Sequence, residues 1–209
     1  RIATERGAAL YQVDNLKKQN PLITNLQGSY QQENATLAYH ACKLLKEEIP
    51  IEENLCKEAL KKVDMLGRWQ IINFPSKIIL DACHNSAGAV CLRENLETLP
   101  EKPEVWVGIL GVDRAPDIMD VIQRHAHAIK IFEVQQPRAC SFSFLRSLIP
   151  KSYEGEVIDF DFKKAKDELF RPALKRTILV TGSIYLIGDI LSIIQKTDSR
   201  KKIDWNDLF

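Results

Sequence analysis

The chain has 209 residues, 45% of them hydrophobic and 27% charged, which suits one well-buried domain with a smaller piece beside it. Its 29 Lys and Arg nearly match its 28 Asp and Glu, and the net charge of +1 excludes the strong field that would attract nucleic acid or an acidic membrane. Its five cysteines are odd in number and include no Cys-x-x-Cys pair, so they indicate reduced thiols in a cytoplasmic protein. The sequence contains no signal-peptide pattern and no apolar run of about 18 residues, the length that a membrane span needs.

Residues 1–66 predict a small helical region. Residues 1–20 lack clear periodicity, and Pro21–Leu26 could form a short strand that leads into a turn at Gly28. After Asn34, apolar residues recur at helical spacing until Pro50, and a second helical pattern follows. The first stripe consists of Leu37, Ala38, Ala41, Leu44 and Leu45, and the second of Leu55, Ala59, Val63 and Leu66.

From residue 67 onward, strand and helix patterns alternate. Segments 68–72 and 77–80 flank Asn-Phe-Pro-Ser and predict a hairpin. Further strands are expected at 105–110, 129–134, 156–158 and 177–181, with helices at about 116–128, 143–149, 160–170 and 183–195. This alternation predicts an α/β fold, with a Rossmann-like, mostly parallel sheet and helices on both faces. The polar tail 196–209 could dock through Trp205 or Phe209.

Polar residues follow two of the predicted strands. An apolar strand ends at Asp81, and the segment Asp-Ala-Cys-His-Asn-Ser leads into a helix, while Gly182–Tyr185 follows the last strand in the same way. Because the carboxyl ends of parallel strands share one edge of a sheet, we expect Asp81, His84 and Ser183 to lie at the same edge. Ligands of open α/β sheets bind at that edge.

Each candidate residue also has an ordinary structural interpretation. Asp81 and Ser183 could cap the helices that follow them, and Asn34 could belong to a helix start with Gln31 nearby. Arg68 could form an exposed salt bridge and His84 could be merely solvated. Pattern alone leaves these alternatives open.

Four ordered motifs resemble the Mur ligase superfamily, in particular its folylpolyglutamate synthase/dihydrofolate synthase branch. The segment 81–86 resembles Asp-Gly-Ala-His-Asn-Pro, with Ala82, Cys83 and Ser86 in place of Gly, Ala and Pro. The segment 28–35 resembles Gly-x-His-Gln-x-x-Asn-Ala, Gly67-Arg68 resembles the Gly-Arg ahead of the hexapeptide, and 181–185 resembles Thr-Gly-Ser-x-Tyr. The last motif favours the folate branch over the related cell-wall ligases. The resemblance covers about residues 20 to 190.

The resemblance implies the C-terminal part of an ATP-dependent ligase that joins L-glutamate to a folate or dihydropteroate carboxylate through an acyl phosphate. Residues 1–66 would be the α-rich tail of a central ATP-binding domain, and residues 67–209 a Mur ligase C-terminal domain. It also implies roles for individual residues: Asp81 and His84 would be catalytic, Asn34, Arg68, Asp81 and His84 would bind ATP, and Ser183 and Tyr185 would bind the amino acid. The loop 111–114 matches the family's Asp-Lys-Asp loop only in part, since Arg114 and Ala115 replace its Lys and second Asp.

The sequence lacks Gly-x-x-x-x-Gly-Lys-Ser/Thr, the loop that cradles ATP phosphates. ATP and Mg²⁺ would therefore be held mainly by an N-terminal half of the ligase, and this chain alone is expected to be inactive. His125-x-His127 has no third ligand nearby in the sequence and is interpreted as solvated surface. The alternative function is a noncatalytic Rossmann-like binding or assembly module that retains the motif residues as helix caps.

Overall fold

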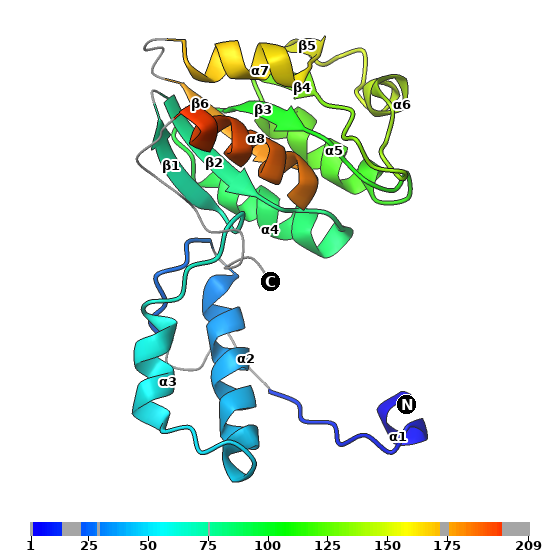
Figure 1. Ribbon diagram of the computed structural model, residues 1–209. Coiled ribbons are helices and arrows are strands. Elements are labelled where there is room, and N and C mark those ends of the chain that lie inside the picture. The colour runs from blue at the N-terminus through cyan, green and yellow to red at the C-terminus, as the bar shows by residue number, and fades with distance from the viewer. Residues whose placement is uncertain (1, 14–21, 29, 75, 172–175, 198–209) are drawn as a thin grey trace. The chain divides into compact units, whose positions relative to one another are not determined.

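The computed structural model describes residues 2–13, 22–28, 30–74, 76–171 and 176–197. The chain divides into two compact units, Arg1–Asp64 and Met65–Phe209. Figure 1 shows helices in the first unit and a sheet covered by helices in the second. None of the helices in these ranges has both the length and the apolar character needed to cross a membrane.

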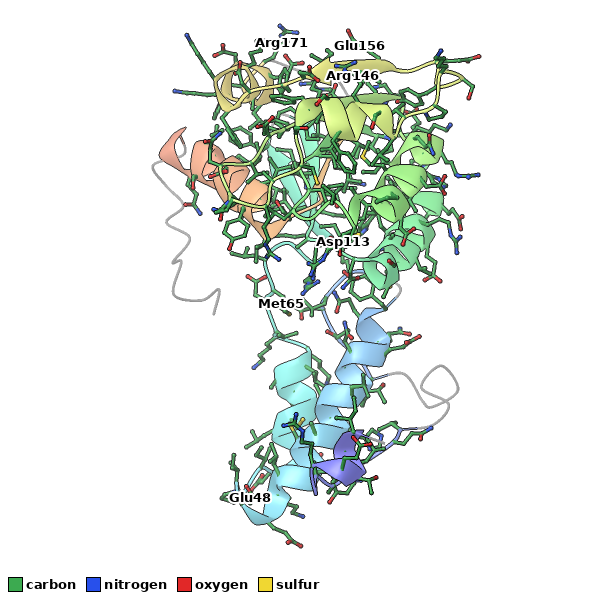
Figure 2. All side chains as sticks on the ribbon, turned by 90° about the vertical axis from the view of Figure 1, so that its right-hand side faces the viewer. Glu48, Met65, Asp113, Arg146, Glu156 and Arg171 are labelled. Carbon is green, nitrogen blue, oxygen red and sulfur yellow. The ribbon has the colours of Figure 1, made fainter. Side chains whose placement is uncertain are left out.

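The first unit contains a pair of helices, as the sequence predicts. After a short α1 (Ile2–Glu5), α2 spans Gln31–Leu44 and continues as one 3-10 turn, Leu45–Glu47. The chain turns at Glu48, which Figure 2 labels, and α3 spans Glu53–Leu60. The helix α2 begins before Asn34 rather than after it, and α3 ends before Val63.

One expectation for the first unit is wrong. Residues 22–26 form no strand, because the described residues of this unit contain no other strand that could pair with them; Pro21 lies outside the described residues. The apolar stripe of α2 and of the turn after it is exposed: Leu37, Leu44 and Leu45 are 45%, 48% and 41% exposed. The buried residues of α2 are instead Gln31, Ala35 and Thr36.

The second unit is a six-stranded sheet with helices between its strands. Its strands are β1 (Gln70–Phe74), β2 (Ser76–Asp81), β3 (Glu104–Val107), β4 (Ala128–Ile131), β5 (Glu156–Asp159) and β6 (Thr177–Thr181). Its helices are α4 (Ser86–Glu97), α5 (Ala115–His125), α6 (Phe142–Ser147), α7 (Phe162–Leu169) and α8 (Ile184–Thr197). The order across the sheet is β1-β2-β6-β3-β4-β5, and only the β1–β2 hairpin is antiparallel. The predicted α/β fold is therefore confirmed.

The strands end where their pairing changes. We expected β3 to reach Leu110 and β4 to reach Val134, but they end at Val107 and Ile131. Beyond that point the carbonyl of Ile109 accepts from the amide of Cys140, in the loop before α6, so the chain leaves the sheet. The part of the predicted tail from residue 198 to 209 lies outside the described residues.

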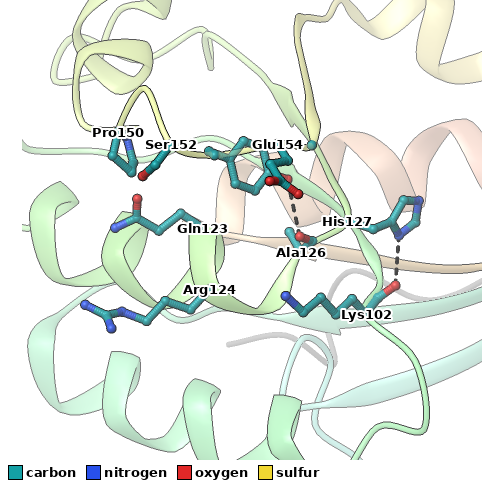
Figure 3. Close-up of a pocket in the computed structure, with 10 residues that line it drawn as sticks. Lys102, Gln123, Arg124, Ala126, His127, Pro150, Ser152 and Glu154 are labelled. Carbon is teal, nitrogen blue, oxygen red and sulfur yellow. Dashed lines mark hydrogen bonds between the residues drawn. The ribbon is translucent and has the colours of Figure 1, made fainter.

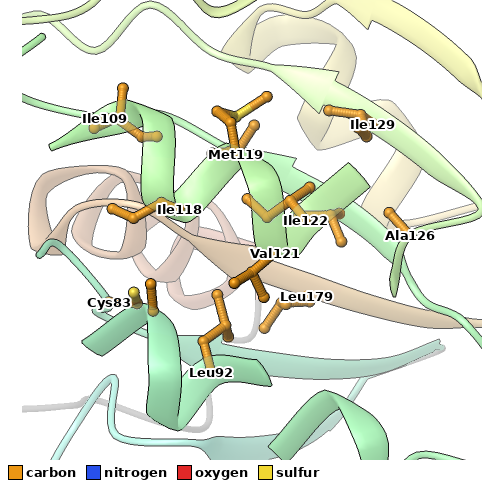
Figure 4. Packing of buried hydrophobic residues seen from close by; sticks show 14 of the residues in the cluster. Cys83, Leu92, Ile109, Ile118, Met119, Val121, Ile122, Ala126, Ile129 and Leu179 are labelled. Carbon is orange, nitrogen blue, oxygen red and sulfur yellow. The ribbon is translucent and has the colours of Figure 1, made fainter. Parts of the chain in front are cut away.

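Alternate side chains of the strands fill two cores, one on each face of the sheet. Ile79, Val105 and Leu179 pack with helices α4, α5 and α6, and Figure 4 shows part of this cluster. Ile78 and Val180 point to the other face, where α7 and α8 pack. Because both faces are covered, the central strands are almost entirely apolar, which is typical of parallel sheets.

The second core also encloses a balanced ion cluster. The Lys130 ammonium lies 2.9 Å from a Glu104 oxygen and 3.3 Å from a Glu168 oxygen, and the Arg176 guanidinium contacts both carboxylates at 3.3 and 2.7 Å. The Lys130 ammonium also lies 4.5 Å from the centre of the Phe160 ring. Two positive and two negative groups therefore balance in charge inside an apolar layer, while the Arg176 Nε is buried without a hydrogen-bond partner among the described residues.

Candidate functional site

Three loops meet at the carboxyl edge of the central strands. β6 lies between β2 and β3, and Thr181 at its end pairs with Asp81 on one side and Val107 on the other. The prediction that Asp81, His84 and Ser183 lie at one edge of a parallel sheet is thus confirmed. The loops pack tightly: Gly182 has φ +103°, and a Cβ there would lie 2.7 Å from the Gly108 carbonyl oxygen. Only glycine fits this position without displacing the neighbouring loop.

Asp81 joins the end of β2 to the preceding loop. Its side chain is buried, and its two oxygens accept hydrogen bonds from the backbone amides of Trp69 at 3.2 Å and Cys83 at 3.0 Å. The interpretation of Asp81 as a helix cap is wrong, because Asn85 caps α4 by accepting from the Gly88 amide at 2.7 Å. Asn85 was not a predicted site residue, although its place before a helical run is a recognisable capping signal.

The loop 67–69 holds Arg68 at this edge. Gly67 and Trp69 both have positive φ, +69° and +50°, and the Gly67 carbonyl accepts from the Ala82 amide at 2.7 Å. The left-handed conformation is unfavourable for a bulky residue such as tryptophan, so it persists only because the surroundings hold it. The Trp69 side chain is buried in the core, and the bond from its amide to Asp81 fixes the loop from the other side.

Arg68 has a half-buried side chain that forms no hydrogen bond or ion pair within the described part of the chain. The expected surface salt bridge is therefore not found among those residues. A guanidinium with five donors and no protein acceptor can bind the oxygens of an anion. The charge of Arg68 reaches the adjacent Cys83, whose pKa it lowers only slightly: burial, helped by Asp81, raises the pKa of that thiol to about 12. Cys83 therefore stays protonated and is not a nucleophile.

His84 is exposed in the loop between Asp81, at the end of β2, and the start of α4. Its Nδ1 is 2.9 Å from the carbonyl oxygen of Ala82. Since a carbonyl can only accept, Nδ1 carries the hydrogen, and Nε2 is left to accept when the ring is neutral or to donate when it is protonated. His84 can thus contact an oxyanion or move a proton through Nε2.

The loop after β6 combines a structural serine with an open tyrosine. Ser183 is buried, and its hydroxyl accepts from the Leu186 amide at 3.2 Å, so it does cap α8. Tyr185, one residue into α8, is 48% exposed. The Thr181 hydroxyl beneath them is buried without a hydrogen-bond partner in the described part of the protein. Tyr185 is therefore more accessible to a ligand than Ser183.

The third loop, 111–114, carries exposed charge at the same edge. The Gly111 amide donates to the Arg138 carbonyl at 2.9 Å, and Asp113, labelled in Figure 2, lies 4.0 Å from the Arg114 guanidinium. The Asp113 side chain is 78% exposed. This weak contact leaves both charges able to meet a ligand.

Asn34 belongs to the other unit. It is exposed on the first turns of α2, and its amide nitrogen donates to the Gln31 side-chain oxygen at 3.2 Å. The Gln31 nitrogen is buried without a hydrogen-bond partner among the described residues. The interpretation of Asn34 as part of a helix start with Gln31 nearby is confirmed, while a role towards adenine stays a prediction.

A separate pocket of about 620 Å³ lies at the opposite, amino edge of the sheet (Figure 3). Its lining includes His127 and Tyr153, which precede β4 and β5. The His127 Nδ1 donates to the Lys102 carbonyl at 2.8 Å, whereas His125 is half-buried at the end of α5. No group of three or more metal-ligating side chains occurs in the described ranges.

Comparison with known proteins gives relatives of one kind. No family model matches the chain. The dihydrofolate synthase/folylpolyglutamate synthase of Bacillus subtilis is 27% identical over 178 residues, which cover 80% of this chain and 40% of the relative. A protein of the same name from Buchnera aphidicola (Schizaphis graminum) is 24% identical over 148 residues, 68% of this chain and 35% of the relative. The chain thus spans about two-fifths of the length of its curated relatives.

Solved structures of similarly named proteins share the fold. A bifunctional folylpolyglutamate synthase/dihydrofolate synthase from Yersinia pestis, complexed with AMPPNP and a manganese ion, gives a TM-score of 0.70 at 19% identity, covering 93% of this chain and 49% of that one. The folylpolyglutamate synthase of Thermotoga maritima gives 0.64 at 22% identity, covering 99% and 52%. The chain is therefore similar in sequence to dihydrofolate synthase/folylpolyglutamate synthases and has the Mur-ligase-like fold of their solved structures.

Proposed function

We propose that this chain is the C-terminal part of an ATP-dependent ligase that joins L-glutamate to the carboxylate of a folate or dihydropteroate through an acyl phosphate. The observation that carries the proposal is the guanidinium of Arg68, which lies half-buried without an acceptor in the described part of the chain. It is held between Gly67 and Trp69 at the edge where an α/β sheet binds ligands. The names of the relatives and the nucleotides in their structures agree with this role.

In the proposed reaction, Arg68 and His84 bind the oxygens of the phosphate that is transferred. Arg68 is always a donor, and His84 donates through Nε2 when its ring is protonated. Donors directed at developing negative charge are the usual way in which protein groups accelerate phosphoryl and acyl transfer. Asp81 has both oxygens occupied by amides, so it acts by positioning Arg68 and the turn of His84. Closure of the domain over the acyl phosphate would keep water away from it while the amine attacks.

The amino acid would bind near the loop after β6. Because the Ser183 hydroxyl already accepts from the Leu186 amide, we propose that it shapes the turn and retains only its hydrogen as a donor. Tyr185 is exposed at the start of α8 and can offer its hydroxyl to the incoming glutamate. Asn34 on α2 would hydrogen-bond the edge of adenine, since an amide matches both its donors and its acceptors.

ATP and Mg²⁺ fit this chain only in part. Arg68 and His84 suit phosphate oxygens, but both Asp81 oxygens accept amides and no metal-ligating cluster occurs among the described residues. We therefore assign the metal and the phosphate loop to an N-terminal half of the ligase. The exposed apolar side chains of α2, including Leu37 and Leu44, are suited to pack against that half. In this proposal residues 1–66 complete the central ATP-binding domain, and residues 67–209 form the C-terminal domain.

A second candidate is a noncatalytic binding or assembly module. It is favoured by one observation: Asp81 and Ser183 both have an ordinary structural role in the loops. Arg68 distinguishes the two candidates, because a scaffold has no use for a half-buried cation without an acceptor.

The test joins this chain to the N-terminal half of the Bacillus subtilis relative and measures ATP-dependent ligation of glutamate. Arg68→Ala should lower turnover about 100- to 1,000-fold, the usual effect of removing one donor to developing charge. Arg146→Ala is the matched control, because Arg146 forms an exposed ion pair with Asp159. Equal turnover in the Arg68 variant and the control, at equal protein stability, would reject the role of Arg68. A folded, unsubstituted chimera that does not ligate glutamate would reject the ligase proposal.

A further inference from the structure

Two cysteines outside the motifs discussed so far lie near each other in the helical unit. Cys42 lies on α2 and Cys56 on α3, and Cys42 is near enough to Cys56 to raise the pKa of its thiol. Both line one small pocket of about 70 Å³ between these helices. Both are free thiols in this structure. Two neighbouring thiols on separate helices are an arrangement from which a disulfide can form.

The two thiols differ in access. Cys56 is only 8% exposed, and burial, followed by the proximity of Cys42, raises the pKa of its thiol. Cys42 is half-buried and therefore more accessible than Cys56. Because a thiol must reach its target to react, Cys42 is suited to react first and Cys56 second.

We propose that Cys42 and Cys56 form a reversible modification site at which low-molecular-weight disulfides, of which glutathione disulfide is the probe, oxidise the pair to a disulfide. The Cys42 thiolate attacks one sulfur of glutathione disulfide, forms a mixed disulfide and releases one glutathione thiolate, which takes up a proton. Cys56 then loses its proton and attacks the Cys42 sulfur, which releases the second glutathione. The two cysteines are oxidised by two electrons, and one glutathione disulfide is reduced to two thiols.

The other three cysteines are poorer partners. Burial raises the pKa of Cys83 to about 12 and also raises the pKa of Cys140, so both react slowly. Cys91 is half-buried on α4, close enough to Cys83 to influence its pKa, and makes Cys83–Cys91 the competing pair. The structure thus favours oxidation in the helical unit over oxidation at the sheet edge.

A disulfide would give the helix pair a link that its packing does not provide. Among the described residues up to Asp64, Ala35 and Cys56 are the buried hydrophobic ones. A bond between Cys42 and Cys56 closes the loop that contains Pro50 and restricts the separation of α2 from α3. Since α2 also carries Asn34, the modification would act on the nucleotide side of the proposed ligase, although the site itself does not depend on that proposal.

The experiment uses the full chain with all five cysteines reduced. After incubation with glutathione disulfide and removal of the reagent, thiols are counted in denaturant, and the chain is digested with trypsin without reduction. We expect the count to fall from five to three, and the tryptic peptides 19–43 and 47–57 to be joined, because cleavage after Lys43 and Lys46 separates them. Reduction with dithiothreitol should restore all five thiols.

Variants identify the pair. Cys42→Ser and Cys56→Ser should each abolish the joined peptides, whereas the control Cys91→Ser should leave them unchanged. If a serine variant loses its helical circular dichroism, the peptide map of the unsubstituted chain still shows whether Cys42 and Cys56 are joined. Retention of all five thiols, a stable glutathione adduct on Cys42 without closure, or a link that involves Cys83 or Cys91 instead would each overturn the proposal.

Discussion

Replacing Asp81 tests whether its carboxylate organises the loop that holds Arg68. In Asp81→Ala, the amides of Trp69 and Cys83 lose their acceptor. Asp81, Trp69 and Cys83 are 5%, 6% and 3% exposed, so water cannot readily replace the lost oxygens. At about 1–3 kcal/mol for each buried unsatisfied donor, the free energy of unfolding should fall by about 2–6 kcal/mol.

The variant Asp81→Asn should lose less free energy of unfolding than Asp81→Ala. The amide keeps one oxygen, which can serve one of the two backbone donors, while its NH₂ group meets the other donor. The expected loss is therefore about half as large, about 1–3 kcal/mol. The control is Asp113→Ala, whose 78% exposed side chain should matter by no more than about 0.5 kcal/mol.

The assay is equilibrium unfolding in urea, followed by tryptophan fluorescence, with Trp69 and Trp106 buried in the sheet unit as reporters. A slope of about 1–3 kcal/mol per molar urea would place the midpoint of Asp81→Ala about 1 M or more below that of the unsubstituted chain. If Asp81→Ala unfolds within about 0.5 kcal/mol of the Asp113 control, the two hydrogen bonds do not hold the loop as described.

Three further outcomes follow from the structure. Gly182→Ala should destabilise the chain by at least about 1–3 kcal/mol in the same urea assay, because it combines strain at positive φ with a Cβ 2.7 Å from the Gly108 oxygen. The control is Gly111→Ala in the same unit, with φ +88° and only the side chains of Asp113 and Arg114 near its Cβ, and equal losses in the two variants would contradict the backbone contact. The isolated chain should fold without ligating glutamate or hydrolysing ATP in a phosphate-release assay, and turnover would mean that it carries a complete active site. Burial lowers the pKa of His125 below its ordinary 6.5, so the unfolded state takes up the proton at a higher pH than the folded state does. The free energy of unfolding should therefore decrease as the pH falls below about 6.5. His125→Gln should flatten that part of the pH–stability profile, and an unchanged profile would assign it to other groups.

The sequence predicted the sheet better than the site. The strand at Thr177–Thr181 and the common edge of Asp81 and Ser183 follow from local pattern and from the rule for parallel sheets. Local pattern could not show that Trp69 adopts a left-handed conformation or that its amide binds Asp81, because that contact joins residues twelve apart through the sheet.

In the helical unit, the sequence predicted a helix but not the burial of its side chains. Spacing identified the helix with Leu37 and Leu44 but not whether anything covers those side chains, since periodicity reports which residues share a face and not what lies against it. The strand expected at Pro21–Leu26 failed for a similar reason: a strand exists only with a partner.

The ion cluster around Lys130 also limits how the sheet can assemble. Lys130 lies in the middle of a buried strand, and a shift of β4 by one residue would turn its ammonium to the opposite face, against the aliphatic side chains of α5. There it would find neither Glu104 nor Glu168, and an uncompensated charge in that layer would cost several kcal/mol. The four charges thus discriminate against misaligned strands during folding, whatever they add to the stability of the correct one.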